Sequence, residues 1–147
     1  MKHTTLKTFA LLGLFVMLAG VSVSAQTATG QMRASIPFDF VAGKAKLKAG
    51  EYRVSHWAGK ILVLRRINER KDNLVFAAYT VQRMGEELPG QLVFHRYGDE
   101  YFLATIWTNG QPIGNGLSQP SRERQLAREL AKTKTRPQSV EIVAQTR

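Results

Sequence analysis

Hydrophobic and polar residues alternate along most of the chain beyond residue 33, with the period of two that is typical of half-buried strands. The alternation predicts strands over residues 34–40, 51–56, 60–66, 74–81, 91–97 and 100–108. Pro37 has no N–H to donate to a ladder, so the first strand is expected to lie at a sheet edge or to be interrupted there. The pattern predicts an all-β fold: a small antiparallel barrel or sandwich of six or seven strands with a C-terminal helix.

The strands over residues 91–97 and 100–108 are predicted to form a hairpin with a two-residue turn. Gly98 stands where a type II′ turn needs a positive φ. That turn places Tyr97 opposite Glu100, and so on down to Val93 opposite Ala104. In this register Arg96 lies over the ring of Tyr101.

A helix is predicted near residues 121–132, after a glycine-rich loop over residues 109–119. Ser121 is the expected cap, and Leu126 and Leu130 recur on one side of the helix. The residues beyond form a basic tail. The pattern leaves open whether residues 140–143 form a short last strand.

The N-terminus has the order of a secretory signal peptide. Lys2 and Lys7 precede an apolar run over residues 9–19, and small side chains stand at Val23 and Ala25. The run is shorter than the roughly 20 apolar residues that a spanning helix needs. We therefore expect cleavage after Ala25, export through the general secretion route, a periplasmic or extracellular location, and a mature chain without a transmembrane segment.

Composition narrows the classes of function. The 147 residues carry a formal charge of +10 and include no cysteine, so residues 26–147 make one domain without disulfides, thiolate nucleophiles or Cys-ligated metals. The basic excess suits anionic envelope polymers or lipid headgroups. Nucleic acid is not an expected partner of an exported chain without a recognisable binding motif.

Residues with catalytic chemistry are sparse. Beyond the signal only His56 and His95 remain, in different predicted strands and without metal-ligand spacing. No serine-hydrolase motif or phosphate-binding loop is present. The sequence thus assigns no catalytic residue, metal or cofactor. A hydrolase or metal-dependent enzyme that uses both histidines is the alternative hypothesis.

Four residues are candidates for binding. Arg124, Arg128 and Lys132 recur every four residues along one side of the predicted helix, and Trp57 lies at the end of a predicted hairpin. An ordinary solvated face is the other interpretation of the basic side chains. The oligomeric state and the ligand stay open.

Several segments resemble a family of small, uncharacterised exported β-rich proteins of soil bacteria. The resemblance rests on Ile36–Phe40, Leu47–Tyr52, Leu92–Asp99, Tyr101–Leu103 with Trp107, and Ser121–Ala127. The chain departs from the family pattern at Lys48, where proline is usual, and around Gln119 and Pro120. The resemblance implies export and a mainly β fold, and it supplies no catalytic residue. The leading hypothesis is a non-enzymatic protein with a binding or structural role in the periplasm or at the cell surface.

Overall fold

The computed structural model describes residues 31–58, 60–69, 73–84 and 89–146. The signal peptide predicted at residues 1–25 lies outside these ranges. The described elements are β1 (Met32–Ile36), β2 (Phe40–Ala42), β3 (Ala45–Leu47), β4 (Gly50–Ala58), β5 (Ile61–Arg66), β6 (Asn73–Gln82), β7 (Gln91–Tyr97), β8 (Glu100–Trp107), β9 (Ile113–Leu117), α2 (Ser121–Lys132), β10 (Gln138–Val143) and β11 (Gln145–Thr146). The all-β class with a C-terminal helix is confirmed. No helix in the described ranges is long and apolar enough to cross a membrane.

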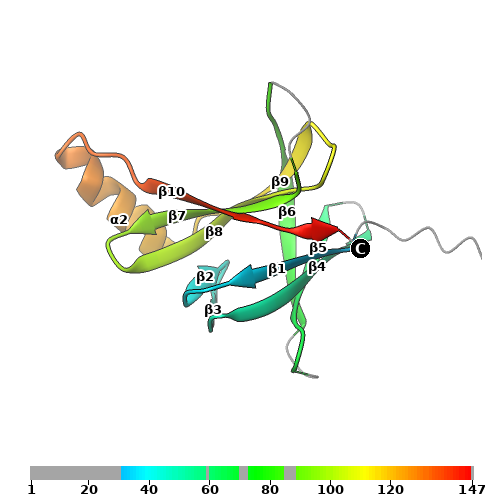
Figure 1. Ribbon diagram of the computed structural model, residues 1–147. Helices are drawn as coiled ribbons and strands as arrows, with labels where there is room; N and C mark the ends of the chain where they lie inside the picture. The colour runs from blue at the N-terminus through cyan, green and yellow to red at the C-terminus, as the bar shows by residue number, and fades with distance from the viewer. Residues whose placement is uncertain (1–30, 59, 70–72, 85–88, 147) are drawn as a thin grey trace, which may run out of the picture.

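The predicted count of six or seven strands is wrong, because the described ranges hold eleven strands in one sheet. The order is β10-β7-β8-β9-β6-β5-β4-β1-β11, with antiparallel neighbours, while β2 pairs with β3 and, in parallel, with β8. No ladder among the described residues joins β10 to β11, so the sheet is not closed into a barrel. These two end strands are consecutive in the chain, and Figure 1 shows the C-terminal segment crossing the molecule from beside β7 toward β1.

One core lies between the two halves of the sheet. Strand β6 belongs to both halves, since residues 73–77 pair with β5 and residues 78–82 pair with β9. Phe40 packs edge-to-face on Tyr52 of β4 and on Phe94 of β7, with ring centroids 5.2 and 5.4 Å apart. The interruption predicted at Pro37 is confirmed, because β1 ends at Ile36 and β2 begins at Phe40. The break turns the chain so that both Ile36 and Phe40 reach the core.

The β7–β8 hairpin confirms most of the predicted register. Gly98 has a φ of 61°, and the pairs from Tyr97–Glu100 to Phe94–Leu103 are as expected. The guanidinium of Arg96 lies 5.4 Å from the centroid of the Tyr101 ring. The predicted pair of Val93 with Ala104 is wrong, because a bulge shifts the register and Val93 faces Thr105. The bulge gives β8 one extra residue, which disrupts the alternation so that Leu103 and Ala104 are both buried.

Part of the predicted loop over residues 109–119 is strand β9. Its glycines made the segment resemble a loop, but two aromatic rings lie across them. A Cβ at Gly114 would lie 2.5 Å from the Trp107 ring, and a Cβ at Gly116 would lie 2.5 Å from the Tyr79 ring. Glycine is therefore required in this strand because the neighbouring aromatic side chains occupy the space.

Helix α2 spans the predicted residues but lacks the predicted cap. Pro120 is the N-cap residue, the helix begins at Ser121, and no side chain caps it. The following strand β10 settles the open question at residues 140–143, because it pairs with β7 over Gln138–Val143.

Candidate functional site

The predicted basic side chains lie in solvent along α2. Arg124, Arg128 and Lys132 are all exposed, while Leu126 on a neighbouring face is half-buried. Arg124 donates to the carbonyl oxygen of Gln119 at 3.1 Å. The arrangement suits a solvated helix face and a binding face equally, so a binding role for these three residues stays a prediction.

Trp57 is the unpaired residue of a β-bulge at the end of β4. His56 pairs with Leu62 and Ala58 pairs with Ile61, which leaves Trp57 without a position in the ladder. Its side chain is 78% exposed. A binding role for Trp57 stays a prediction, now with the geometry of an accessible indole.

The two candidate histidines do not meet. The Nε2 atom of His56 lies 3.0 Å from the side-chain amide nitrogen of Asn115 in β9. His95 of β7 contacts Glu123 of α2 instead. No group of three or more potential metal ligands occurs within the described residues. The alternative enzyme hypothesis therefore lacks a shared site for its two histidines in the described part of the chain.

A buried carboxylate attaches α2 to the sheet. Glu123 is only 1% exposed and is the one buried residue of this helix. Its Oε1 atom lies 2.7 Å from Nδ1 of His95 and accepts from Gln119 at 3.4 Å. Burial raises the pKa of Tyr97, and the charge and hydrogen bond of Glu123 raise it further. The contacts satisfy a carboxylate that would otherwise be costly to bury, so the cluster has a structural explanation.

Three arginines face each other across adjacent strands, and we call them the arginine row. Arg33 of β1 pairs with Arg53 of β4, and Arg53 pairs with Arg65 of β5. Directly opposed residues on antiparallel strands point to the same side of the sheet, with Cβ atoms about 4.5–5.5 Å apart. Arg33 and Arg53 are half-buried, and Arg65 is exposed. The row therefore gathers three positive charges on one solvent-facing surface.

Two of the three arginines in the row lack a charge partner among the described residues. Neither Arg33 nor Arg53 forms a hydrogen bond or ion pair with any described residue. Glu51 lies two positions before Arg53 on the same side of β4, yet no ion pair joins the two. Like charges that are directly opposed destabilise a sheet. The opposition of Arg33 and Arg53 is thus a feature that folding alone does not explain.

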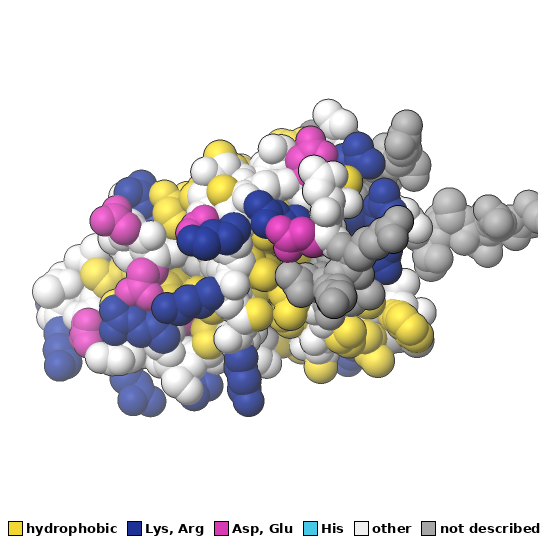
Figure 2. Space-filling view, turned by 90° about the horizontal axis from the view of Figure 1, so that it is seen from below, with side chains coloured by type: hydrophobic (Ala, Val, Ile, Leu, Met, Phe, Trp, Pro, Cys, Tyr) yellow, Lys and Arg dark blue, Asp and Glu magenta, His cyan; other side chains and the backbone are white. Residues whose placement is uncertain are grey.

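Exposed apolar side chains lie on the neighbouring strand positions, and we call them the apolar strip. The strip consists of Trp57 (78% exposed), Ile61 (38%), Val75 (60%) and Tyr79 (51%). Figure 2 shows, on the face seen from below, hydrophobic side chains at the surface beside Lys and Arg. Exposed apolar side chains that gather on one surface often mark an interaction site.

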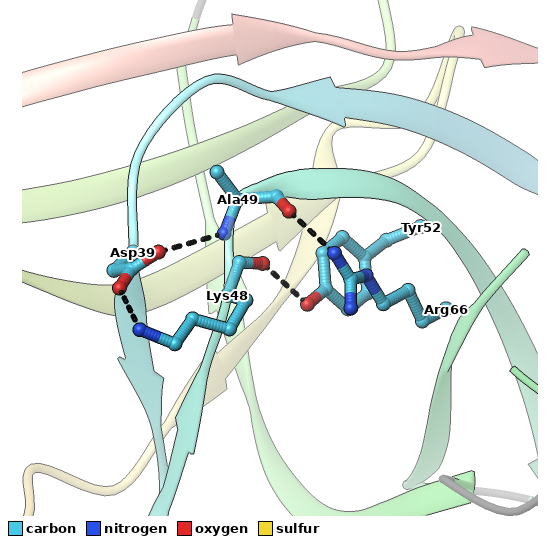
Figure 3. Close-up of polar contacts among 5 residues, drawn as sticks. All are labelled: Asp39, Lys48, Ala49, Tyr52 and Arg66. Atoms are coloured by element: carbon cyan, nitrogen blue, oxygen red, sulfur yellow. Dashed lines mark hydrogen bonds and ion pairs between the residues drawn. The ribbon is translucent and has the colours of Figure 1, made fainter. Parts of the chain in front are cut away.

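A cleft of about 300 Å³ lies near the start of β4, between the β2–β3 hairpin and the β7–β8 turn. Figure 3 shows how its wall is held: Asp39 accepts from Lys48 at 2.8 Å and from the backbone N–H of Ala49 at 2.9 Å. Tyr52 donates to the carbonyl oxygen of Lys48, and Arg66 donates to that of Ala49. The hydrogen bond from Lys48 in particular lowers the pKa of Asp39. The hydrogen bonds among Asp39, Lys48 and Ala49 fix this turn.

Comparisons with known proteins give no relative. No family model, no curated protein and no solved structure matches the chain. The resemblance to exported proteins of soil bacteria accordingly stays a prediction.

The sequence analysis missed the arginine row. Arg53 and Arg65 stand at outward positions of two strands that the pattern predicted as a hairpin. Their pairing could therefore have been predicted from the sequence. The pairing of Arg33 could not be predicted in this way. It lies just before the first predicted strand, and β1 pairs with β4 across two intervening strands.

Proposed function

We propose that the protein is an exported, non-enzymatic binding protein that attaches to anionic groups of the cell envelope through the arginine row. The observation that carries this proposal is the direct opposition of Arg33, Arg53 and Arg65 on three adjacent strands. Phosphate, carboxylate and sulfate are the chemical groups that guanidinium binds through two parallel hydrogen bonds.

The geometry favours a ligand with repeated negative charge. Neighbouring strands lie about 4.8 Å apart, so the three guanidinium groups start from positions with that spacing. Because the residues stand on paired strands, their backbone positions are fixed before the ligand arrives, and only the side chains remain to be ordered. A bound anion also relieves the repulsion between opposed arginines.

The test compares two variants that remove equal charge. One changes Arg33, Arg53 and Arg65 to Gln, and the matched control changes Arg124, Arg128 and Lys132 to Gln. With long-chain inorganic polyphosphate as the probe, we expect the first variant to bind at least about a hundredfold more weakly, because three charge-assisted contacts are lost. The helix variant should stay within about threefold of the parent, since only long-range attraction falls. Titration calorimetry at low and high salt measures both.

Two outcomes contradict the proposal. If the arginine-row variant binds polyphosphate as well as the parent, the row is not the site. If the helix variant alone loses binding, the basic side of α2 is the anionic site and the row is merely tolerated. Circular dichroism of each variant confirms that the strands remain formed.

Export is part of the proposal, and it rests on the N-terminal pattern and on the family resemblance. We expect the exported protein to begin at Gln26, because Val23 and Ala25 supply the small side chains that precede cleavage. Mass spectrometry of the released protein checks this. An intact chain retained in the inner membrane is the contrary result.

A further inference from the structure

The apolar strip lies on the same side of the sheet as the arginine row. Arg65 and Val63 lie on the same side of β5, where Val63 is buried (8% exposed) and is directly opposed to the exposed Val75 of β6. Ile61 continues that side and faces Ala77. The outward positions of β4 run from Arg53 through Ser55 to the bulge at Trp57. One surface over β4, β5 and β6 therefore changes from cationic to apolar within a few residues.

Packing inside the protein explains only part of the strip. Tyr79 faces Gly116 of β9, and its ring lies flat across that glycine with half of the side chain in solvent. Val75 occurs at an outward position with no covering element among the described residues and is 60% exposed. Strand positions that always face solvent usually carry polar residues.

We infer that the arginine row and the apolar strip together bind the surface of an anionic lipid bilayer. This inference rests on the proposed function and names its partner. The row would contact lipid phosphates, and the strip would enter the boundary between headgroups and acyl chains.

The composition of the two features matches that environment. Trp and Tyr favour the headgroup level, where an aromatic body meets a polar boundary, and the aliphatic Ile61 and Val75 gain by leaving water. Basic residues near an anionic bilayer are attracted to its surface. A soluble polyanion would engage the row but would leave Ile61 and Val75 in water. Charge complementarity beside exposed aliphatic side chains thus favours the bilayer over a polysaccharide.

The experiment separates the two features with a charge-neutral variant. Trp57→Gln, Ile61→Thr and Val75→Thr are combined, which keeps β-branched residues in β5 and β6 and every arginine in place. Binding is measured by co-sedimentation with phosphatidylcholine vesicles that contain a minority of phosphatidylglycerol, with pure phosphatidylcholine vesicles and free polyphosphate as further arms. All variants share the same N-terminus, so differences between them report this surface alone.

We expect the strip variant to bind anionic vesicles at least about tenfold more weakly than the parent while binding polyphosphate unchanged. The arginine-row variant should lose both. Equal vesicle binding by the parent and the strip variant would overturn the bilayer inference and leave the proposed function standing. If both variants bind polyphosphate as tightly as the parent, the proposed function itself is overturned.

A second measurement uses the two tryptophans of the chain. With Trp107→Phe, the emission comes from Trp57 alone, and lipids brominated in their acyl chains should quench it when anionic vesicles are added. Bound protein whose Trp57 emission is not quenched would contradict insertion of the strip.

Discussion

Deleting residues 138–147 is expected to abolish cooperative unfolding of the protein. Strand β10 pairs with β7 at six positions, and β11 pairs with β1 at the other end of the sheet. Ala144 between them is buried, and its N–H donates to the carbonyl oxygen of Gly90 at 2.8 Å. The segment therefore fixes both ends of the strand order at once.

The expected loss is comparable to the total stability of a small domain. Each ladder hydrogen bond contributes about 1 kcal/mol, and the partly buried Val140 and Ile142 add their apolar contacts with the core. Such a domain is stable by about 5–15 kcal/mol in all. Urea unfolding followed by circular dichroism measures the loss, and deletion of residues 145–147 alone is the milder control. A protein truncated after Pro137 that unfolds at the parent's urea midpoint would show that β10 is dispensable.

Replacing Glu123 with Ala is expected to lower the free energy of unfolding by about 2–4 kcal/mol. The change removes the carboxylate that contacts Nδ1 of the half-buried His95 and the hydroxyl of the buried Tyr97. It also removes the one buried side chain by which α2 meets the sheet.

The matched control is Glu129→Ala on the exposed side of the same helix. Glu129 accepts from Gln125 at 3.1 Å in solvent, so its loss should cost no more than about 0.5 kcal/mol. Equal stability of the two variants in thermal unfolding would mean that the Glu123 cluster does not hold the helix.

Local pattern was enough to predict the hairpin around Gly98. The turn needs a positive φ at one residue, glycine is there, and the alternation on both sides meets at it. The boundaries of α2 were predictable for a similar reason, because Pro120 and the apolar spacing limit the helix. Both are short-range features, decided by residues that are neighbours in the chain.

Elements that depend on distant partners were not predictable. Strand β9 is stabilised by Trp107 and Tyr79, whose rings fill the space above Gly114 and Gly116. No periodicity within residues 109–119 carries that information. The position of Glu123 is another such case. An acidic residue in the first turn of a helix is favourable by itself, so Glu123 gave no sign that His95 would face it.

The arginine row combines both situations. The outward positions of Arg53 and Arg65 follow from alternation, but the addition of Arg33 requires the pairing of β1 with β4. The surface proposed to bind anions is therefore a product of strand order. The positions of the three arginines in the sequence do not predict that they lie side by side.

Nuclear magnetic resonance of the arginine side chains tests the central claim most directly. Polyphosphate is added to the labelled protein, and the Nε–H signals are assigned by single Arg→Gln changes at positions 33, 53 and 65. We predict that these three signals shift together and saturate at one ligand concentration, while the signals of Arg124 and Arg128 move little. Shifts confined to the arginines of α2, with Arg33, Arg53 and Arg65 unmoved, would contradict the account.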